Sequence, residues 1–92
     1  MSKTVSKEQA FWFCNSKGWV GRIAHSLEEF AKEIKVVPIE SLEFHLRDGK
    51  NDFEAWLSSV MQEKRLAKRI AKIKKEGLRD EELRKALVSL FE

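Results

Sequence analysis

The chain has 92 residues, 42% of them hydrophobic, with six phenylalanines and three tryptophans. This length is typical of one domain, which buries somewhat more than ~60% of its unfolded surface and has a small margin of stability. Its 18 basic and 15 acidic residues give a net charge of +3, too small to indicate nucleic-acid binding by itself. The single cysteine, Cys14, excludes an internal disulfide framework and a cysteine-rich zinc site.

No apolar run approaches the ~18 residues that a membrane span needs, and no signal peptide is recognisable, so we expect a cytoplasmic protein without a membrane partner. Charged residues make up 36% of the chain, whereas asparagine and glutamine together number four. This combination is typical of thermophilic proteins. Residues 1–8 carry one apolar side chain after Met1 and predict a flexible arm. Residues 9–92 then form a single globular domain.

An aromatic β-hairpin is predicted next. The apolar run 10–14 is followed by Asn-Ser-Lys-Gly at 15–18 and by a second β-prone run at 19–24. A four-residue loop that ends in glycine is typical of a hairpin, with Gly18 in the left-handed conformation. The first run does not alternate polar and apolar residues, so helices cover both faces or one face meets a partner. The candidate interface residues are Phe11, Trp12, Phe13 and Trp19.

Helices are predicted for most of the remaining chain. Ser-Leu-Glu-Glu at 26–29 is a capping-box pattern that begins a helix ending near Val37. Residues 38–46 fit both a strand and a helix, and the N-terminal Pro38 favours the helix. Arg-Asp-Gly-Lys at 47–50 predicts a turn, with Asp48–Gly49 as its signal.

Three further helical segments follow this turn. Asn51 or Asp52 caps a helix with Phe53, Trp56, Leu57 and Val60 on its apolar side. Residues 63–76 form a second helix, either continuous with the first or kinked near Gln62, and Gly77 ends it. Asp80 is predicted to cap the last helix.

The helix predicted for residues 63–76 has a strongly basic face. Residues 64–75 include seven basic and no acidic side chains. On a helical wheel Leu66, Ile70 and Ile73 lie on one side. The other side carries Lys64, Arg65, Lys68, Arg69, Lys72 and Lys75. This pattern fits either a solvated face or a contact with a nucleic-acid backbone or another polyanion. A sequence-reading helix-turn-helix is disfavoured, because its recognition helix would begin with the acidic residues 80–82.

Side chains capable of catalysis do not form a recognisable constellation. His45 has acidic neighbours in Asp48 and Asp52, which suggest a metal site or an acid/base pair, but the spacing lacks the three or four ligands of a metal site. We therefore predict a structural joint in which Asp52 caps a helix, His45 binds a carboxylate or carbonyl, and Trp56 packs beside them. Cys14 has no adjacent base, and no glycine-rich phosphate loop is present. The sequence predicts no enzyme activity, no metal and no cofactor.

Three stretches resemble a family of short, mostly archaeal domains of unknown function. They are Pro-Ile-Glu-Ser-Leu-Glu-Phe-His at 38–45, Asn-Asp-Phe-Glu-Ala-Trp at 51–56, and Leu66-Ala67 with Ile70. The resemblance implies a helix at 38–46 and implies no activity. Some relatives carry the domain attached to larger proteins, which suits an accessory module.

These patterns together predict an α+β domain that is predominantly helical, with an N-terminal two-stranded aromatic hairpin packed against four or five helices. The first functional hypothesis is a non-catalytic interaction module that forms a homodimer or binds a protein partner, because the hairpin has more aromatics than one face can bury. The alternative is non-sequence-specific binding of nucleic acid or another polyanion by the basic residues of 64–75.

Overall fold

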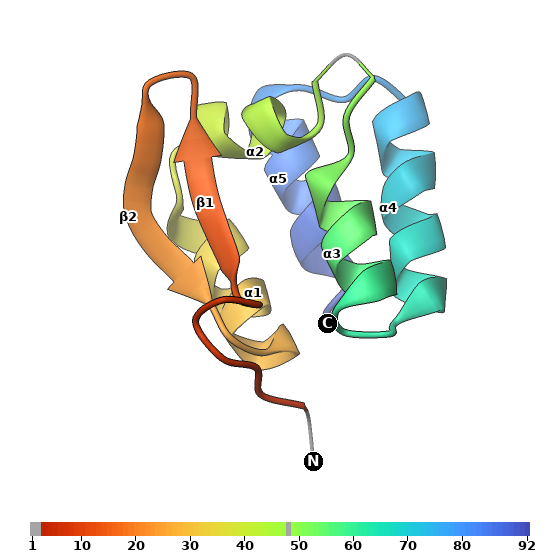
Figure 1. Cartoon of the computed structure of the whole chain (residues 1–92). Helices are drawn as coiled ribbons and strands as arrows, with labels where there is room; N and C mark the ends of the chain where they lie inside the picture. Colours follow the sequence, from red (N-terminus) through yellow and green to blue (C-terminus); the bar gives the residue numbers. More distant parts are fainter. Residues whose placement is uncertain (1–2, 48) are drawn as a thin grey trace.

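A computed structural model describes residues 3–47 and 49–92, and it confirms the predominantly helical α+β fold. Within this part of the chain a hairpin precedes five helices (Figure 1). The elements are β1 (Phe11–Asn15), β2 (Gly18–Ala24), α1 (Leu27–Val36), α2 (Ile39–His45), α3 (Asp52–Ser59), α4 (Lys64–Lys75) and α5 (Asp80–Ser89). None of the helices in the described residues is long and apolar enough to cross a membrane.

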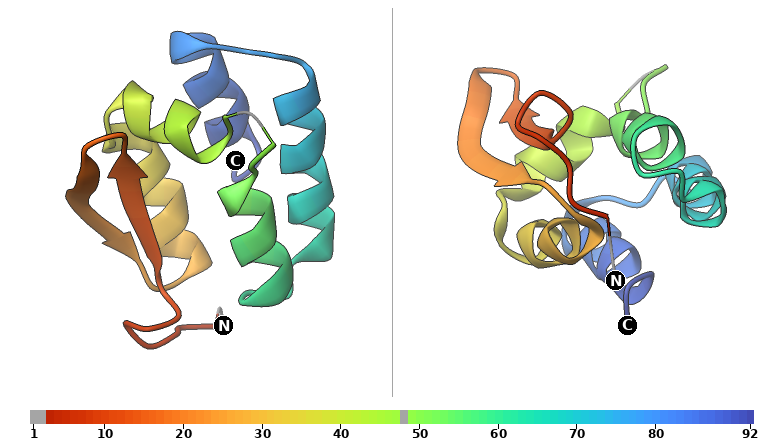
Figure 2. Two further views of the ribbon diagram at one scale, coloured as in Figure 1. Left: turned by 45° about the horizontal axis from the view of Figure 1, so that its top comes forward. Right: turned by 60° about the horizontal axis from the view of Figure 1, so that its bottom comes forward.

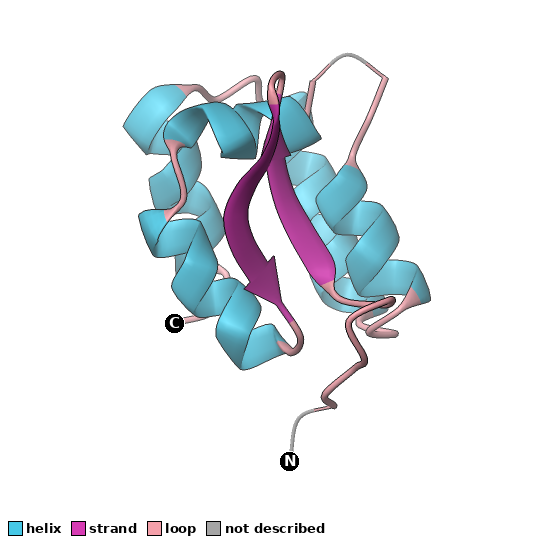
Figure 3. Cartoon of the chain, turned by 60° about the vertical axis from the view of Figure 1, so that its left-hand side comes forward, coloured by secondary structure: helices cyan, strands magenta, loops and turns pink. Residues whose placement is uncertain are grey.

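The hairpin lies on one side of the molecule and α4 on the opposite side, with α5 between them (Figures 1 and 2). The inner face of the hairpin meets the helices. In Figure 3 the outer face is turned toward the viewer and no helix crosses it. In the described part of the chain, one face of the sheet therefore has no helix packed on it.

The hairpin is antiparallel and contains an irregularity. Trp12 pairs with Ile23 and Cys14 pairs with Trp19, and the register shifts between Phe13 and Cys14. Gly18 has a φ of 123°, as the hairpin prediction requires. The register shift leaves extra residues of β2 opposite β1, which increases local twist and interrupts the ladder.

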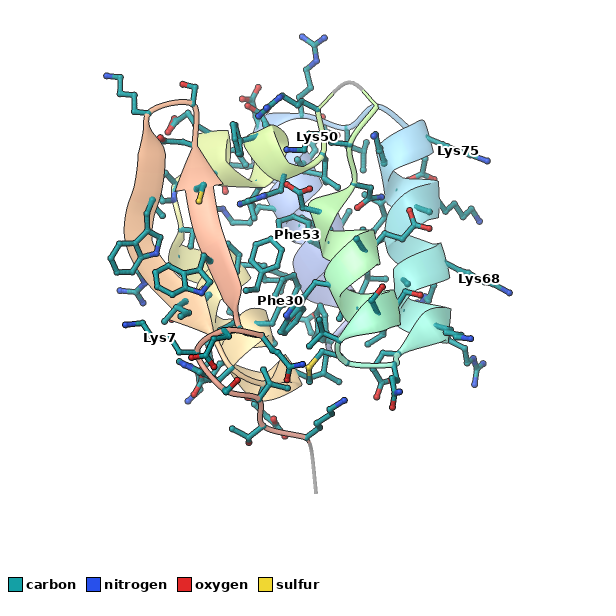
Figure 4. All side chains as sticks on the ribbon, viewed as in Figure 1. Lys7, Phe30, Lys50, Phe53, Lys68 and Lys75 are labelled. Atoms are coloured by element: carbon teal, nitrogen blue, oxygen red, sulfur yellow. The ribbon has the colours of Figure 1, made fainter. Side chains whose placement is uncertain are left out.

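An aromatic cluster joins the hairpin to the helices. Phe30 of α1 is fully buried, and its ring centroid lies 5.3 Å from that of Phe53 of α3. Figure 4 shows these two rings between the hairpin and the helices. Phe11 and Phe13 point inward to the same cluster, with 6% and 0% exposure. Aromatic groups at such distances and tilts stabilise a core beyond the area they bury.

The helix boundaries agree with the sequence except at one end. The Ser26 hydroxyl accepts a hydrogen bond from the Glu29 N–H, which confirms the predicted cap of α1. A residue with φ of 59°, Gln62, separates α3 from α4, which settles the choice between one continuous helix and two. The prediction that Asp80 caps α5 is wrong. Asp80 is the first helical residue, and its N–H donates to the carboxylate of Glu43 on α2 at 3.0 Å.

The N-terminal segment contacts the domain. Val5 of the segment predicted as a flexible arm is buried, and its N–H donates to the His25 carbonyl at 2.8 Å. An isolated bridge joins Thr4 and Ser26 beside it. Asp48, the predicted turn residue, lies outside the described residues.

Candidate functional site

His45 at the end of α2 is hydrogen bonded through both ring nitrogens. Its Nε2 accepts the backbone N–H of Cys14 on β1 at 2.9 Å. Its Nδ1 lies 2.8 Å from a carboxylate oxygen of Asp52 on α3. Because Nε2 is an acceptor, the ring is neutral and Nδ1 carries the proton. His45 therefore links the hairpin to two helices, and neither nitrogen is free for a metal or a proton transfer.

Ser41 completes this link one helical turn earlier. Its hydroxyl donates to the Cys14 carbonyl at 2.8 Å, and the side chain is fully buried. Ser41 and His45 are four residues apart, so they share one face of α2. Together they bind the N–H and the C=O of a single residue, as a neighbouring strand would. The edge of β1 is therefore closed at Cys14.

Asn51 and Asp52 have separate roles at the start of α3. The Asn51 side chain caps the helix by accepting the Glu54 N–H at 3.0 Å. The sequence offered both residues as the cap, and the prediction that Asp52 of the joint caps this helix is wrong. With Asn51 as the cap, the Asp52 carboxylate is directed at His45. Trp56 is buried, and its indole N–H donates to the Gln9 carbonyl at 2.8 Å, which ties α3 to the chain before the hairpin.

Burial lowers the pKa of His45, and the hydrogen bond that its ring donates to the Asp52 carboxylate opposes part of that effect. Below a pH of about 6.5, a histidine in the unfolded chain takes up a proton that folded His45 resists. The unfolded state then binds more protons, so the free energy of unfolding falls as the pH falls.

We expect stability to decline between about pH 7 and pH 5, measured by urea unfolding at several pH values. The His45→Asn variant should show a smaller change in the free energy of unfolding over this pH range. An unchanged pH dependence in that variant would contradict the assignment of the effect to His45.

The outer face of the hairpin carries two neighbouring tryptophans. Trp12 and Trp19 have ring centroids 5.1 Å apart, and Trp19 is 55% exposed. The strand register places Trp12, Cys14, Trp19 and Ile23 on the same side of the sheet. We call these four residues the tryptophan face. Phe11 and Phe13, also predicted as interface residues, are in the core instead, because alternate residues of a strand point to opposite faces.

Polar groups of the tryptophan face are bonded within the chain. The Trp12 indole N–H donates to the Lys7 carbonyl at 3.1 Å, and the Lys7 ammonium lies 5.6 Å from the Trp12 ring centre. The Trp19 indole N–H donates to the Arg22 carbonyl at 2.9 Å. The Arg22 guanidinium pairs with Glu33 at 2.5 Å. What the face offers to a partner is therefore the apolar surface of its rings.

The six basic residues predicted for the helix face are all exposed on α4. Figure 4 shows two of them, Lys68 and Lys75, pointing away from the rest of the molecule. The opposite side of α4 is in the core through Ala67, Ile70 and Ile73. Lys74 differs from the other basic residues, since its ammonium donates to the carbonyls of Arg47 and Lys50.

Within the described residues, no group of three or more His, Cys, Asp and Glu side chains could hold a metal ion. The Cys14 thiol contacts the Trp12 carbonyl at 3.5 Å. His45 binds the backbone N–H of Cys14 and not its thiol. The roles of Ser41 and of the Cys14 backbone were not predicted from the sequence. The four-residue spacing of Ser41 and His45 was the available signal.

The fold and these surfaces define a small α+β domain whose hairpin is anchored by a buried histidine and whose prominent surfaces are apolar and basic. The chain matches over residues 1–92 the model of a family of unknown function, DUF5752, and it belongs to that family. No curated protein and no solved structure matches it.

Proposed function

We propose that the chain is a non-catalytic interaction module that associates with a second copy of itself through the tryptophan face. The observation that carries the proposal is the 55% exposure of Trp19 beside Trp12, on a sheet face that no helix covers. Large aromatic side chains left in water are a frequent mark of interfaces. The absence of a free nitrogen on His45 supports a binding role over catalysis.

A second copy is the occupant that fits the charge pattern. The four residues of the tryptophan face are themselves uncharged, and the Lys7 ammonium is held over the Trp12 ring of its own chain. Two copies related by a two-fold axis can therefore pack through the Trp19 side of the face without opposing like charges. Pairing through strand edges is less favourable. Ser41 and His45 close the edge of β1, and the irregularity in β2 interrupts its ladder. We therefore expect the two copies to pack through the tryptophan face rather than through a strand edge.

The size of the hairpin determines how strong the self-association is expected to be. Strands of five and seven residues offer a face of roughly 20 by 10 Å, from the rise per residue and the strand spacing. This is well below the ~800 Å² per partner of a stable interface, so we expect weak association that is visible at high protein concentration.

Light scattering over a concentration series tests the proposal. The mass should rise from 10.8 kDa toward twice that value as the concentration reaches hundreds of micromolar. Trp19→Glu should keep the chain monomeric, because it places a charge in the contact. Val36→Glu is the matched control, since Val36 is 60% exposed and lies on α1 outside the tryptophan face. A native chain that stays monomeric throughout the series would reject self-association.

The cytoplasmic location is also a proposal. Its support is the single cysteine, which suits a reducing compartment. Thiol labelling of the chain isolated from its native cells would test it, and Cys14 should be found reduced.

A further inference from the structure

We propose that the exposed side of α4 binds the sugar–phosphate backbone of duplex nucleic acid without sequence preference. We call this side the basic face. It consists of Lys64, Arg65, Lys68, Arg69, Lys72 and Lys75. The site goes beyond self-association and is independent of it, because α4 and the hairpin lie on opposite sides of the molecule (Figures 1 and 2).

The geometry of α4 spaces these charges regularly. At 100° per residue, the six side chains span an arc of about 140°. Lys64 and Lys75 are separated by about 17 Å along the axis at 1.5 Å per residue. The major groove of a B-form duplex is ~12 Å wide. A helix of this length laid across the groove reaches phosphates on both of its sides.

The basic face is not neutralised within the described part of the chain. None of its six side chains has an ion pair there, whereas Arg22 and Arg84 each pair with a glutamate. Helix α4 also has no acidic residue from Lys64 to Lys75. The six positive charges are therefore available to an external polyanion, and each phosphate contact releases condensed counterions from a duplex.

The surroundings of the basic face favour a duplex over other anions. The apolar side of α4 is buried through Ala67, Ile70 and Ile73, so this helix cannot insert into a membrane. The helix has no aromatic residue on which the bases of a single strand could stack. Base-specific reading is disfavoured, because α5, the second helix of the α4–α5 pair, begins with Asp80, Glu81 and Glu82.

The test is fluorescence anisotropy with a labelled 20-base-pair duplex of mixed sequence, titrated with the full chain at low salt. The variant Lys64→Glu/Lys68→Glu/Lys72→Glu should weaken binding at least tenfold and reduce the salt slope by about three. The matched control is Lys32→Glu/Lys35→Glu/Lys85→Glu. It makes the same change in net charge at exposed positions of α1 and α5. It should retain the native slope and most of the affinity.

A glutamine version of the α4 triple variant guards against misfolding, since glutamate near the C-terminus of a helix is unfavourable. It should bind more weakly than the native chain while keeping its circular dichroism. Absence of duplex binding at low salt would overturn the proposal. An equal loss of duplex affinity in the α4 triple variant and in its charge-matched control would also overturn it. So would tighter binding to a single strand or to phosphatidylserine vesicles than to the duplex. The Trp19→Glu variant should still bind the duplex. A failure of the self-association proposal can therefore be distinguished from a failure of the duplex-binding proposal.

Discussion

Replacement of Phe30 by alanine is expected to lower the free energy of unfolding by about 3–5 kcal/mol, the usual range for a buried phenylalanine. Phe30 is fully buried, and its ring lies within 5.8 Å of the rings of Phe11 and Phe13 on the hairpin and of Phe53 and Trp56 on α3. The substitution therefore leaves a cavity where the hairpin and the helices meet.

The loss is large for a chain of this length. A 92-residue domain has a total stability of about 5–14 kcal/mol. The midpoint of thermal unfolding should fall by roughly 12 °C or more, measured by circular dichroism. Phe91→Ala is the control, because Phe91 contacts the same ring at 5.7 Å but is only partly buried near the C-terminus. A Phe30 variant no less stable than the Phe91 variant would contradict this placement of the core.

Replacement of His45 by alanine is expected to cost about 2–4 kcal/mol. The Cys14 N–H would lose its acceptor, and an unsatisfied buried donor alone costs about 1–3 kcal/mol. The ring also contacts Phe11 at 4.7 Å and Phe53 at 5.3 Å, so packing is lost as well. Urea unfolding at pH 7.5 measures the difference, where His45 is neutral.

The chain supplies a matched control in its second histidine. His25 lies 3.1 Å from the carboxylate of Glu29, much as His45 lies beside Asp52, but its side chain is 32% exposed against 5% for His45. His25→Ala should cost less than about 1 kcal/mol, because a hydrogen bond between exposed side chains contributes little net stability. Equal losses for the two alanine variants would show that His45 does not anchor the hairpin.

Local patterns in the sequence predicted most of the fold. The spacing of apolar residues and the glycine, proline and serine signals located the hairpin and the helices. The basic face was also predictable, since its six residues needed only the helical period. Which side of the hairpin is covered depends on the packing of α1, α2 and α3. For that reason Phe11 and Phe13 could not be separated from Trp12 and Trp19.

Features that depend on distant backbone groups were not predictable. The Ser41 and His45 side chains bind a residue about 30 positions earlier, and no pattern in the sequence marks that backbone as their target. The prediction that Asp80 caps α5 is wrong because the helix already begins at Asp80. The Asp80 N–H is bound by Glu43, a residue that comes near only in the folded chain. The sequence predicted that His45 binds a carboxylate or a carbonyl, but its partner on β1 could be found only in the folded chain.

The contact of Ser41 and His45 with the backbone of β1 has a consequence for how sequences of this family can vary during evolution. Ser41 and His45 recognise the main chain of residue 14, and any amino acid with an N–H presents the same two groups. This contact therefore sets no requirement on the side chain at position 14, with the exception of proline, which has no N–H to donate. Selection should act instead on positions 41 and 45, where a changed side chain ends the contact.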